Sequence, residues 1–531
     1  MGSNDKTLAK AASSSTDKGH SCSQQRHCWE CLRRRLVCDS THPVCNRCSI
    51  AGVVCPGYDN TQPLKWLAPG RVKVRNRRPR GSSSAKATKN SCKAVVAART
   101  GTRSPPFMDV IKWTWPPELR AEAFIFSEAA EYYNTCIYQD LIHIHDLAYN
   151  DAVFPITREH LQHAARVPDY IKYIFVCVAL SHRINRTRND PELKTLVRRI
   201  WEYRGIVIRG LREDIEEGSK RHFDIILAGI ISLLLVDAQQ GSSPDWLCHI
   251  DMIQALISMR GGFRAACTSS LDPVILCFFY VLALGNTTSP ASSLVMTRSN
   301  VEDLDFIIER YGDRTFQFHL LPPPLFAEIV RINHLRMRAS SGMAGGEDLS
   351  QEAYEILARI EAFSSDNWAD SKPAMKREWA LVALSTQAAA ALYCIASLQS
   401  LGVLPLSDIL EACRIEHGIS LHAYLKEALP SIRIRRFVGW PLYVLGMEAA
   451  NSCGGMKDFV RNELVGMSYH IGTNTPLVAK ELLERFWASG DSRWDSCFDK
   501  PYPLATPIAI DVEDGCLYFD ASRYLAPKSR W

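Results

Sequence analysis

Six cysteines lie close together near the amino end of this 531-residue chain, and their spacing is regular. They are Cys28, Cys31, Cys38, Cys45, Cys48 and Cys55. The pattern C-x2-C-x6-C occurs twice, with the second copy 17 residues after the first. Thiolates at this spacing are typical Zn²⁺ ligands, because a C-x2-C pair can face one ion from the start of a helix and a third cysteine can return to it.

The number of thiolates predicts how many ions they hold. Each repeat supplies three sulfurs, whereas a structural zinc ion takes four ligands in a tetrahedron. Two ions need eight bonds, and six cysteines provide eight only if two sulfurs bridge both ions. Such a centre leaves no position for water or substrate, so we expect two structural Zn²⁺ ions per chain rather than a catalytic metal.

Two other interpretations of these cysteines remain open. A single zinc site could use the two C-x2-C pairs alone, with Cys38 and Cys55 as bystanders, although this leaves the repeated third cysteine unexplained. A redox C-x2-C pair would need a strand–helix–strand setting, and neither pair lies beside a strand pattern. Cys22 and Cys92 match no ligand position, and we interpret them as ordinary thiols.

The stretch CWECLRRRLVCDSTHPVCNRCSIAGVVCPGY resembles the DNA-binding domain of the fungal Zn2Cys6 binuclear-cluster transcription factors. Over residues 28–58 the six cysteines, the basic run after the second and the proline before the fourth fall in register. The resemblance implies a small domain of short helices and loops in which Cys28 and Cys45 bridge two zinc ions. It also implies that the loop at Pro43 is the hinge between the two halves.

The basic run consists of Arg33, Arg34 and Arg35. An arginine on a metal-anchored helix can bond O6 and N7 of guanine in the major groove while its neighbours bind phosphates. By the resemblance, Arg34 and Arg35 fall at the family's base-reading pair, and the expected target is double-stranded DNA with CGG half-sites. We expect Arg33 and Arg47 to contact phosphates. Outside this cysteine frame, such a run would simply be a solvated basic face.

The sequence departs from the family pattern beside this run. Val37 and Leu32 stand where basic residues are common, which predicts a weaker hold on phosphates. No heptad pattern of apolar residues occurs between Asn60 and Pro106, so a homodimer and monomeric binding both stay open.

Charge divides the chain into a basic head and an acidic body. Residues 1–110 contain 20 Lys and Arg against 6 Asp and Glu, whereas the rest contains 42 against 51. A second basic stretch consists of Arg71, Lys73, Arg75, Arg77, Arg78 and Arg80. We interpret it as a nuclear import signal or a phosphate-binding arm, with a solvated linker as the alternative. The expected location is the nucleus.

Beyond residue 118, apolar residues recur at helical spacing, which predicts a large all-α domain. The expected helices are Leu119–Ala148, Asp169–Ile184, Glu192–Leu211, Phe223–Val236, Trp246–Met259, Gln351–Phe363, Lys376–Leu401, Ile409–Leu429 and Val438–Ala450. The chain is therefore divided into a disordered tail (1–27), the cluster domain (28–58), a basic and mostly disordered linker (59–118) and the helical domain (119–531). The longest apolar run, 225–236, is too short to cross a membrane, and we expect no membrane partner.

Two fragments of the helical domain are similar to a fungal-specific regulatory domain found in such transcription factors. One is Trp246-x2-His249 leading to Arg260-Gly261-Gly262, and the other is Gly439-Trp440-Pro441-Leu442 with Glu448-Ala449. Helix capping explains parts of both, because paired glycines end a helix and proline suits its first turn.

No catalytic constellation is evident in the body, so we expect no enzyme. The group His143-x-His145-Asp146 lies in a helical pattern where residues two apart do not share a face, which favours ordinary polar positions. The hypothesis is a sequence-specific regulator of RNA polymerase II genes that contacts the transcription machinery, with a metabolic or biosynthetic gene cluster as the target by analogy. The alternatives are a zinc-stabilised nucleic-acid-binding scaffold and an enzyme body tethered to DNA by the cluster.

Overall fold

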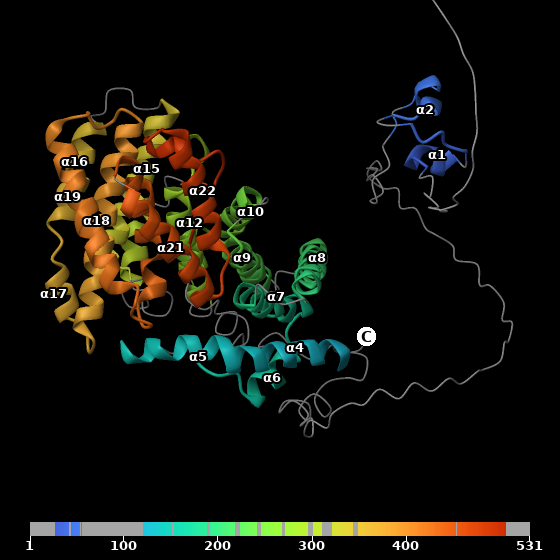
Figure 1. Cartoon of the computed structure of the whole chain (residues 1–531). Coiled ribbons are helices and arrows are strands. Elements are labelled where there is room, and N and C mark those ends of the chain that lie inside the picture. Colours follow the sequence, from blue (N-terminus) through green and yellow to red (C-terminus); the bar gives the residue numbers. More distant parts are fainter. Residues whose placement is uncertain are drawn as a thin grey trace, which may run out of the picture. The chain divides into compact units, whose positions relative to one another are not determined.

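A computed structural model describes two compact units, one within residues 1–99 and one within 100–531. The described residues are 27–34, 36–41, 44–51, 53, 55, 120–150, 153–187, 192–217, 223–241, 246–267, 271–295, 301–310, 321–342, 349–452 and 454–505. All regular elements in these ranges are helices (Figure 1). The expected helical class is therefore confirmed for this part of the chain, and each unit is considered by itself.

The small unit contains two short helices, α1 (Trp29–Arg34) and α2 (Asn46–Ile50). Each begins directly after a cysteine of the repeat, Cys28 for α1 and Cys45 for α2. The sulfur of Cys45 accepts the backbone N–H of Cys48, as a helix-capping side chain does. The cysteines thus determine where both helices start.

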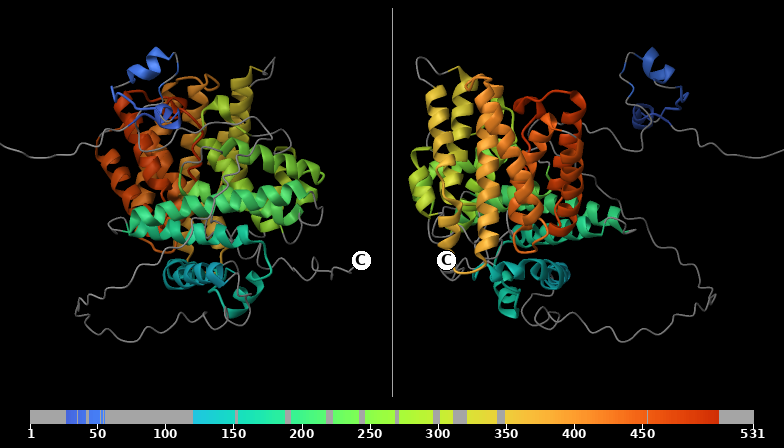
Figure 2. Two further views of the ribbon diagram at one scale, coloured as in Figure 1. Left: turned by 90° about the vertical axis from the view of Figure 1, so that its right-hand side faces the viewer. Right: turned by 60° about the vertical axis from the view of Figure 1, so that its left-hand side comes forward.

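The first described helices of the large unit form a long rod in which the helix type changes along the chain. Helix α4 (Arg120–Tyr132) passes through a π-turn (Tyr133–Ile137) into α5 (Tyr138–Leu141) and a 3-10 turn (Ile142–Asp146). At the π-turn the Asn134 side chain donates to Ile156 O at 2.9 Å and accepts from Ile156 N at 2.8 Å. The rod runs across one end of the other helices, with α6 (Arg158–Ala164) beside it (Figures 1 and 2).

The remaining helices pack around a single apolar core. They are α7 (Asp169–Arg186), α8 (Leu193–Glu217), α9 (Phe223–Gln239), α10 (Trp246–Met259), α11 (Phe263–Ala266), α12 (Asp272–Thr287), α15 (Pro323–Ser341), α16 (Leu349–Glu361), α17 (Ser365–Asp370), α18 (Lys376–Ser400), α19 (Asp408–Ala428), α20 (Gly439–Glu448), α21 (Gly454–Ile471) and α22 (Thr475–Ser489). Each helix expected from the sequence is present, with its ends shifted by a few residues. Figure 2 shows α16, α18 and α19 side by side at one edge.

The most apolar long helix is α18. It is the one described helix long and apolar enough to cross a membrane, but 78% of its apolar window is buried inside the protein. It packs against α15, α16, α17, α19 and α20. Because neighbouring helices cover it on several sides, α18 is a core helix of the bundle, as is α9, which contains the apolar run 225–236.

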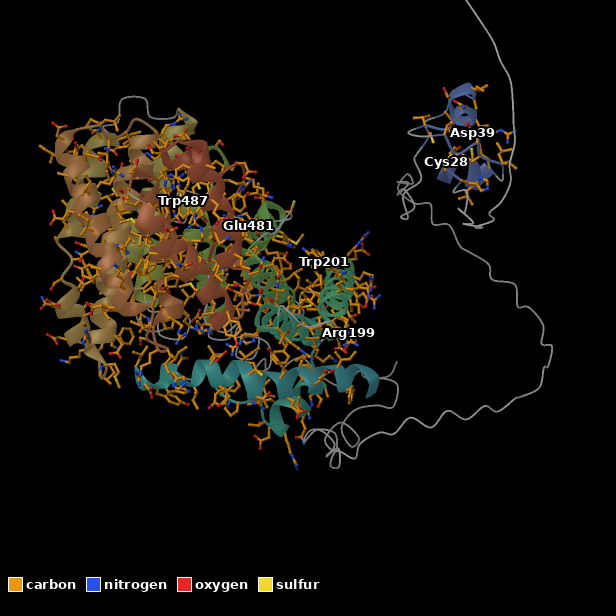
Figure 3. The ribbon with its side chains drawn as sticks, in the orientation of Figure 1. Cys28, Asp39, Arg199, Trp201, Glu481 and Trp487 are labelled. Atoms are coloured by element: carbon orange, nitrogen blue, oxygen red, sulfur yellow. The ribbon has the colours of Figure 1, made fainter. Side chains whose placement is uncertain are left out.

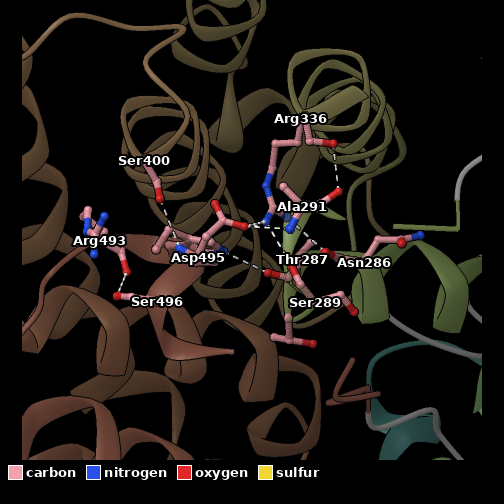
Figure 4. A network of polar contacts seen from close by, with 12 residues as sticks. Asn286, Thr287, Ser289, Ala291, Arg336, Ser400, Arg493, Asp495 and Ser496 are labelled. Atoms are coloured by element: carbon pink, nitrogen blue, oxygen red, sulfur yellow. Dashed lines mark hydrogen bonds and ion pairs between the residues drawn. The ribbon is translucent and has the colours of Figure 1, made fainter. Parts of the chain in front are cut away.

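A buried polar network joins the carboxyl-terminal segment to the core (Figure 4). The guanidinium of Arg336 is fully buried and donates to Asn286 O at 3.0 Å, Ser289 O at 3.0 Å and Asp495 Oδ1 at 2.9 Å. Its Nη1 also donates to the Tyr393 hydroxyl at 2.9 Å. A buried cation is tolerated only when its donors find acceptors, so this network fixes the segment around Asp495 against α12, α15 and α18.

Glycines end the helices where the chain turns sharply. Helix α10 stops at Met259, and Gly261 and Gly262 follow with φ of 102° and 94°. These left-handed values suit glycine because other side chains would be strained there. The predicted helix end is confirmed. Helix α15 likewise runs to Ser341 and ends at Gly342, which has a φ of 65°.

Candidate metal centre

Sulfur forms the core of the small unit. Among its described residues only Cys28, Cys31, Cys38, Cys45 and Cys48 are buried, and Cys55 and Val53 pack against them. The apolar side chains Leu32, Leu36, Val37, Val44 and Ile50 are exposed. A unit this small cannot be held together by so little apolar burial, and such domains rely on metal ions or disulfides. No disulfide joins these described cysteines.

The 17-residue repeat of the sequence is also a repeat of backbone contacts. The Cys31 N–H donates to Cys28 Sγ at 3.4 Å, and the Cys48 N–H donates to Cys45 Sγ at 3.3 Å. The helix-ending bonds Leu36 N→Cys31 O (2.9 Å) and Val53 N→Cys48 O (3.1 Å) correspond in the same way. The two halves therefore present their thiols with equivalent local geometry.

The distances between sulfurs match a tetrahedral metal site. Cys28 Sγ lies 3.6 Å from Cys45 Sγ and 3.7 Å from Cys48 Sγ, and Cys31 Sγ lies 3.8 Å from Cys45 Sγ. Four sulfurs at about 2.3 Å from a tetrahedral Zn²⁺ are about 3.8 Å apart. The Cys28, Cys31, Cys45 and Cys48 sulfurs all lie within 4.8 Å of one another. This cysteine cluster could bind a metal ion without rearrangement.

Cys45 belongs to a second converging group. Its sulfur, the Cys38 sulfur and a carboxylate oxygen of Asp39 lie within 4.8 Å of one another. Cys38 Sγ also accepts, at 3.5 Å, the backbone N–H of Cys28, which is the first cysteine of the first repeat. Cys38, the third cysteine of the first repeat, therefore lies close to both Cys45 and Cys28.

Burial raises the pKa of Cys28, Cys31 and Cys48 to about 12. Without a cation these thiols would stay protonated at neutral pH. A bound cation reverses this, because a coordinating thiol loses its proton. Metal binding and proton release are therefore coupled in this cluster.

The arginines differ in what they contact. Arg34 is exposed, and its Nε lies 3.3 Å from Glu30 Oε1 one turn earlier, which is a weak surface pair. Arg47 Nη1 donates to Val37 O at 2.7 Å and so ties α2 to the first repeat. Four of its five N–H donors remain for other partners. The Arg33 side chain, Arg35, Pro43 and the stretch Arg71–Arg80 lie outside the described residues.

Two residues that the sequence did not single out complete the small unit. His27 Nδ1 accepts the Cys38 backbone N–H at 3.1 Å. Asp39 accepts the Asn46 backbone N–H at 3.0 Å at the start of α2 and a hydrogen bond from the Thr41 hydroxyl, which lowers the pKa of its carboxyl (Figure 3). Both fix the loops between cysteines, and only their position next to a cysteine could have pointed to them.

Comparison with known proteins identifies the family. Residues 129–504 match the model of the fungal specific transcription factor domain. The chain is also 40% identical over 496 residues, 92% of its length, to the phomenoic acid biosynthesis cluster-specific transcriptional regulator of Leptosphaeria maculans, covering 91% of that protein. The chain belongs to the fungal-specific transcription factor family. No solved structure matches it.

This membership makes the chain a transcriptional regulator rather than an enzyme, as expected from the sequence. The first of the two regulatory-domain fragments joins α10 to α9 in the structure. His249 Nε2 lies 3.5 Å from Asp237 Oδ2, and Arg260 Nη1 lies 2.7 Å from Asp224 Oδ1. Asp237 is also held by Arg204 through two hydrogen bonds, of 3.0 and 2.8 Å. The motif therefore stabilises the regulatory domain.

The second fragment of the fungal regulatory domain packs α20 into the core. Trp440 is buried, and its Nε1 donates to Thr287 Oγ1 at 2.9 Å. Glu448 accepts two hydrogen bonds of 2.6 Å from Arg414 on α19. Pro441 lies in the first turn of α20, as the sequence predicted. Both fragments thus hold helices of the body together.

Two polar groups of the body that could suggest chemistry, His145 and Asp146, have structural partners. His145 uses both ring nitrogens, with Nε2 2.9 Å from Val153 O and Nδ1 accepting the Asn150 N–H at 3.2 Å. Asp146 pairs with Arg433 at 2.8 Å. The cavity of about 220 Å³ between α7, α8 and α9 is lined by Cys177, and burial raises the pKa of that thiol to about 12, which makes it a poor nucleophile.

Proposed function

We propose that this regulator binds DNA in the nucleus through a Zn2Cys6 cluster and controls RNA polymerase II genes. The observation that carries the proposal is the sulfur core of the small unit, built from two equivalent halves. A unit without an apolar core needs bound ions to fold, and an all-thiol donor set favours zinc. The transcription factor domain in the same chain supports a DNA-binding role for this unit.

The six cysteines would hold two Zn²⁺ ions, with Cys28 and Cys45 bridging. Of the Cys28, Cys31, Cys45 and Cys48 sulfurs, those of Cys28 and Cys45 each lie within 3.8 Å of two sulfurs from the other half. Cys31 and Cys38 would complete one ion, and Cys48 and Cys55 the other. The ions supply folding free energy and no reaction chemistry, because every coordination position is taken by protein sulfur.

The metal would fix α1 so that its arginines meet DNA. Arg34 and Arg35 would read guanine in CGG half-sites, while Arg33 and Arg47 would contact phosphates. The exposed and weakly paired Arg34 supports this, because little is lost when it leaves Glu30 for DNA. Residues 59–118, with the basic stretch Arg71–Arg80, would link this domain to the regulatory domain (119–531) and serve in nuclear import or phosphate binding.

The controlled genes are proposed to form a biosynthetic cluster. The support is the name of the relative from Leptosphaeria maculans, a cluster-specific regulator of phomenoic acid biosynthesis that aligns over nearly the whole length of both chains. The regulatory domain would contact the transcription machinery, either as a monomer or as a homodimer.

Metal content and DNA binding of the purified full chain test the proposal. We expect the full chain to hold two zinc ions more than the Cys45→Ser variant, and to bind a CGG duplex more tightly than a shuffled duplex or RNA. Arg34→Ala and Arg35→Ala should each reduce the preference for CGG by about 5- to 150-fold, the value of one bidentate guanine contact. Arg212→Ala, at an exposed arginine of α8, is the matched control and should change nothing.

Two results would contradict the proposal. A difference of fewer than two zinc ions between the full chain and Cys45→Ser would exclude the binuclear cluster. Equal affinity for CGG and shuffled duplexes, or for RNA, would favour a scaffold that uses zinc only to fold.

A further inference from the structure

A second group of metal-ligating side chains lies in the helical body, far along the chain from the cysteine cluster. It consists of Glu361 at the end of α16 and of Cys413 and His417 on α19. One donor atom from each residue lies within 4.8 Å of the others. His417 Nε2 is 2.8 Å from Glu361 Oε1, and Cys413 Sγ is 3.6 Å from the same oxygen.

The helices place these three groups on one small surface. Cys413 and His417 are four residues apart, so they project from the same face of α19. Both are partly buried, and the Glu361 side chain is 46% exposed. Solvent ions can therefore reach the group, while the two α19 ligands are restrained by their surroundings.

The backbone that carries the group is held from both sides. The Gln387 amide on α18 donates to Ile360 O at 2.8 Å and to Phe363 O at 2.9 Å, which fixes the chain on both sides of Glu361. Next to Cys413, the buried Arg414–Glu448 pair fixes α19 against α20. The donor groups are thus positioned before any ion binds, which reduces the ordering cost of binding.

We propose that Glu361, Cys413 and His417 bind a Zn²⁺ ion whose fourth position is open to water. Thiolate, imidazole and carboxylate are all zinc ligands, and sites with three protein ligands keep an exchangeable position. The Glu361 carboxylate would move away from His417 to admit the ion, which its exposure permits. This site is independent of the cluster proposed for the small unit.

Charge and protons balance at this site. Burial and the neighbouring Glu361 carboxylate raise the pKa of Cys413 to about 11, so the thiol is protonated before the ion binds. Zn²⁺ forms a bond to the sulfur, and the thiol proton leaves to solvent. His417 coordinates through Nε2 with its proton on Nδ1. One thiolate and one carboxylate then neutralise the two positive charges of the ion.

The ion would join the end of α16 to α19. In the metal-free protein this contact rests on two hydrogen bonds to a half-exposed carboxylate, which contribute little. A ligand that binds only the folded state stabilises it in proportion to its concentration. The regulatory domain would thereby respond to available zinc through a site separate from DNA binding.

Alkylation of single cysteines in the full, zinc-loaded chain tests the site. Iodoacetamide labelling with and without added Zn²⁺, followed by peptide mass spectrometry, reports each thiol separately. We expect zinc to slow labelling of Cys413 at least tenfold and to leave the exposed Cys248 unchanged. His417→Gln and Glu361→Gln should each weaken the protection of Cys413, and neither change removes the thiol that is measured.

The zinc content of the full chain gives a second readout. The wild-type chain should hold one zinc more than the Cys413→Ser variant, whatever the occupancy of the amino-terminal cluster. A loss of zinc from the cluster would lower both counts equally, so failure of the two proposals is distinguishable. Cys413 labelling that is insensitive to zinc, or protection that persists fully in His417→Gln, would overturn the site.

Discussion

The small unit and the helical body bury different kinds of side chain. In the described part of the small unit, every buried side chain is a cysteine, while five larger apolar side chains face solvent. In the body, aromatic and aliphatic side chains fill the core, among them Phe278, Phe279 and Phe326. Buried charged groups such as Arg336 bond to opposite charges or to carbonyl groups. On the proposal above, the small unit depends on bound ions to fold, whereas the body is held together mainly by its own side chains. Their stabilities should therefore respond to different perturbations.

Removing metal should have the largest effect, and this effect should fall mainly on the small unit. Structural zinc in small domains contributes about 10 kcal/mol or more, so a strong chelator or Cys45→Ser should unfold residues 27–55. Hydrogen exchange with peptide-level mass spectrometry of the full chain measures this. Peptides from 27–55 should lose protection while those from α9, α12 and α18 keep it. Cys136→Ser in the π-turn is the control, and a protected small unit without metal would refute the comparison.

Breaking a buried ion pair should affect only the body. Arg414→Met leaves the Glu448 carboxylate buried without its partner, which should cost about 3–5 kcal/mol of unfolding free energy. Urea denaturation followed by circular dichroism measures this loss, and peptides from residues 27–55 should keep their protection from hydrogen exchange. Because burial raises the pKa of Glu448, the deficit should shrink at acidic pH, where the lone carboxyl is protonated.

The double variant Arg414→Met with Glu448→Leu sharpens the result. It removes both charges, so most of the lost stability should return. If the double variant is no more stable than Arg414→Met alone, packing of the arginine stem rather than the unpaired charge is responsible.

The smallest expected effect concerns His182. Its ring is buried between Tyr132, 3.0 Å from Nδ1, and Asp140, 3.5 Å from Nε2, and burial lowers its pKa. Below about pH 6.5 the unfolded chain binds a proton at this histidine before the folded protein does, so stability falls as the pH falls. His182→Gln should flatten this part of the curve between pH 7.5 and 5. An unchanged slope in unfolding free energy would contradict the assignment.

The sequence predicted the small unit well because cysteine spacing is a direct geometric constraint. The two C-x2-C-x6-C copies become two equivalent sets of backbone contacts in the structure. What the sequence could not supply is the role of each arginine, because Arg47 bonds a carbonyl of the other repeat that lies ten residues away. The number of ions and the DNA contacts stay predictions.

In the body, the sequence predicted α9 and α20, which are almost completely buried, but it missed α12, α15, α21 and α22. Helix α12 is buried on all sides, so its apolar residues show no period of 3.6. Helix α15 begins among prolines and buries Glu328, Asn333 and Arg336, which makes it look like a surface segment. Its polar residues are satisfied by partners distant in sequence, and a pattern within one helix cannot reveal them.

The Glu361–Cys413–His417 group was missed for a related reason. The two α19 ligands are spaced four apart, which is a visible signal, but a pair of this kind is common. Glu361 joins them only through the packing of α16 and α19 onto α18.

The attachment of Asp495 to Arg336 has a genetic consequence. A premature stop codon just after Ser489 would leave every long helix from α4 to α22 in the encoded chain. It would nevertheless remove Asp495, the carboxylate partner of the buried Arg336, and Trp494, which donates to Thr287 O. Such an allele should behave as a loss of function through degradation, although it encodes almost the whole regulatory domain.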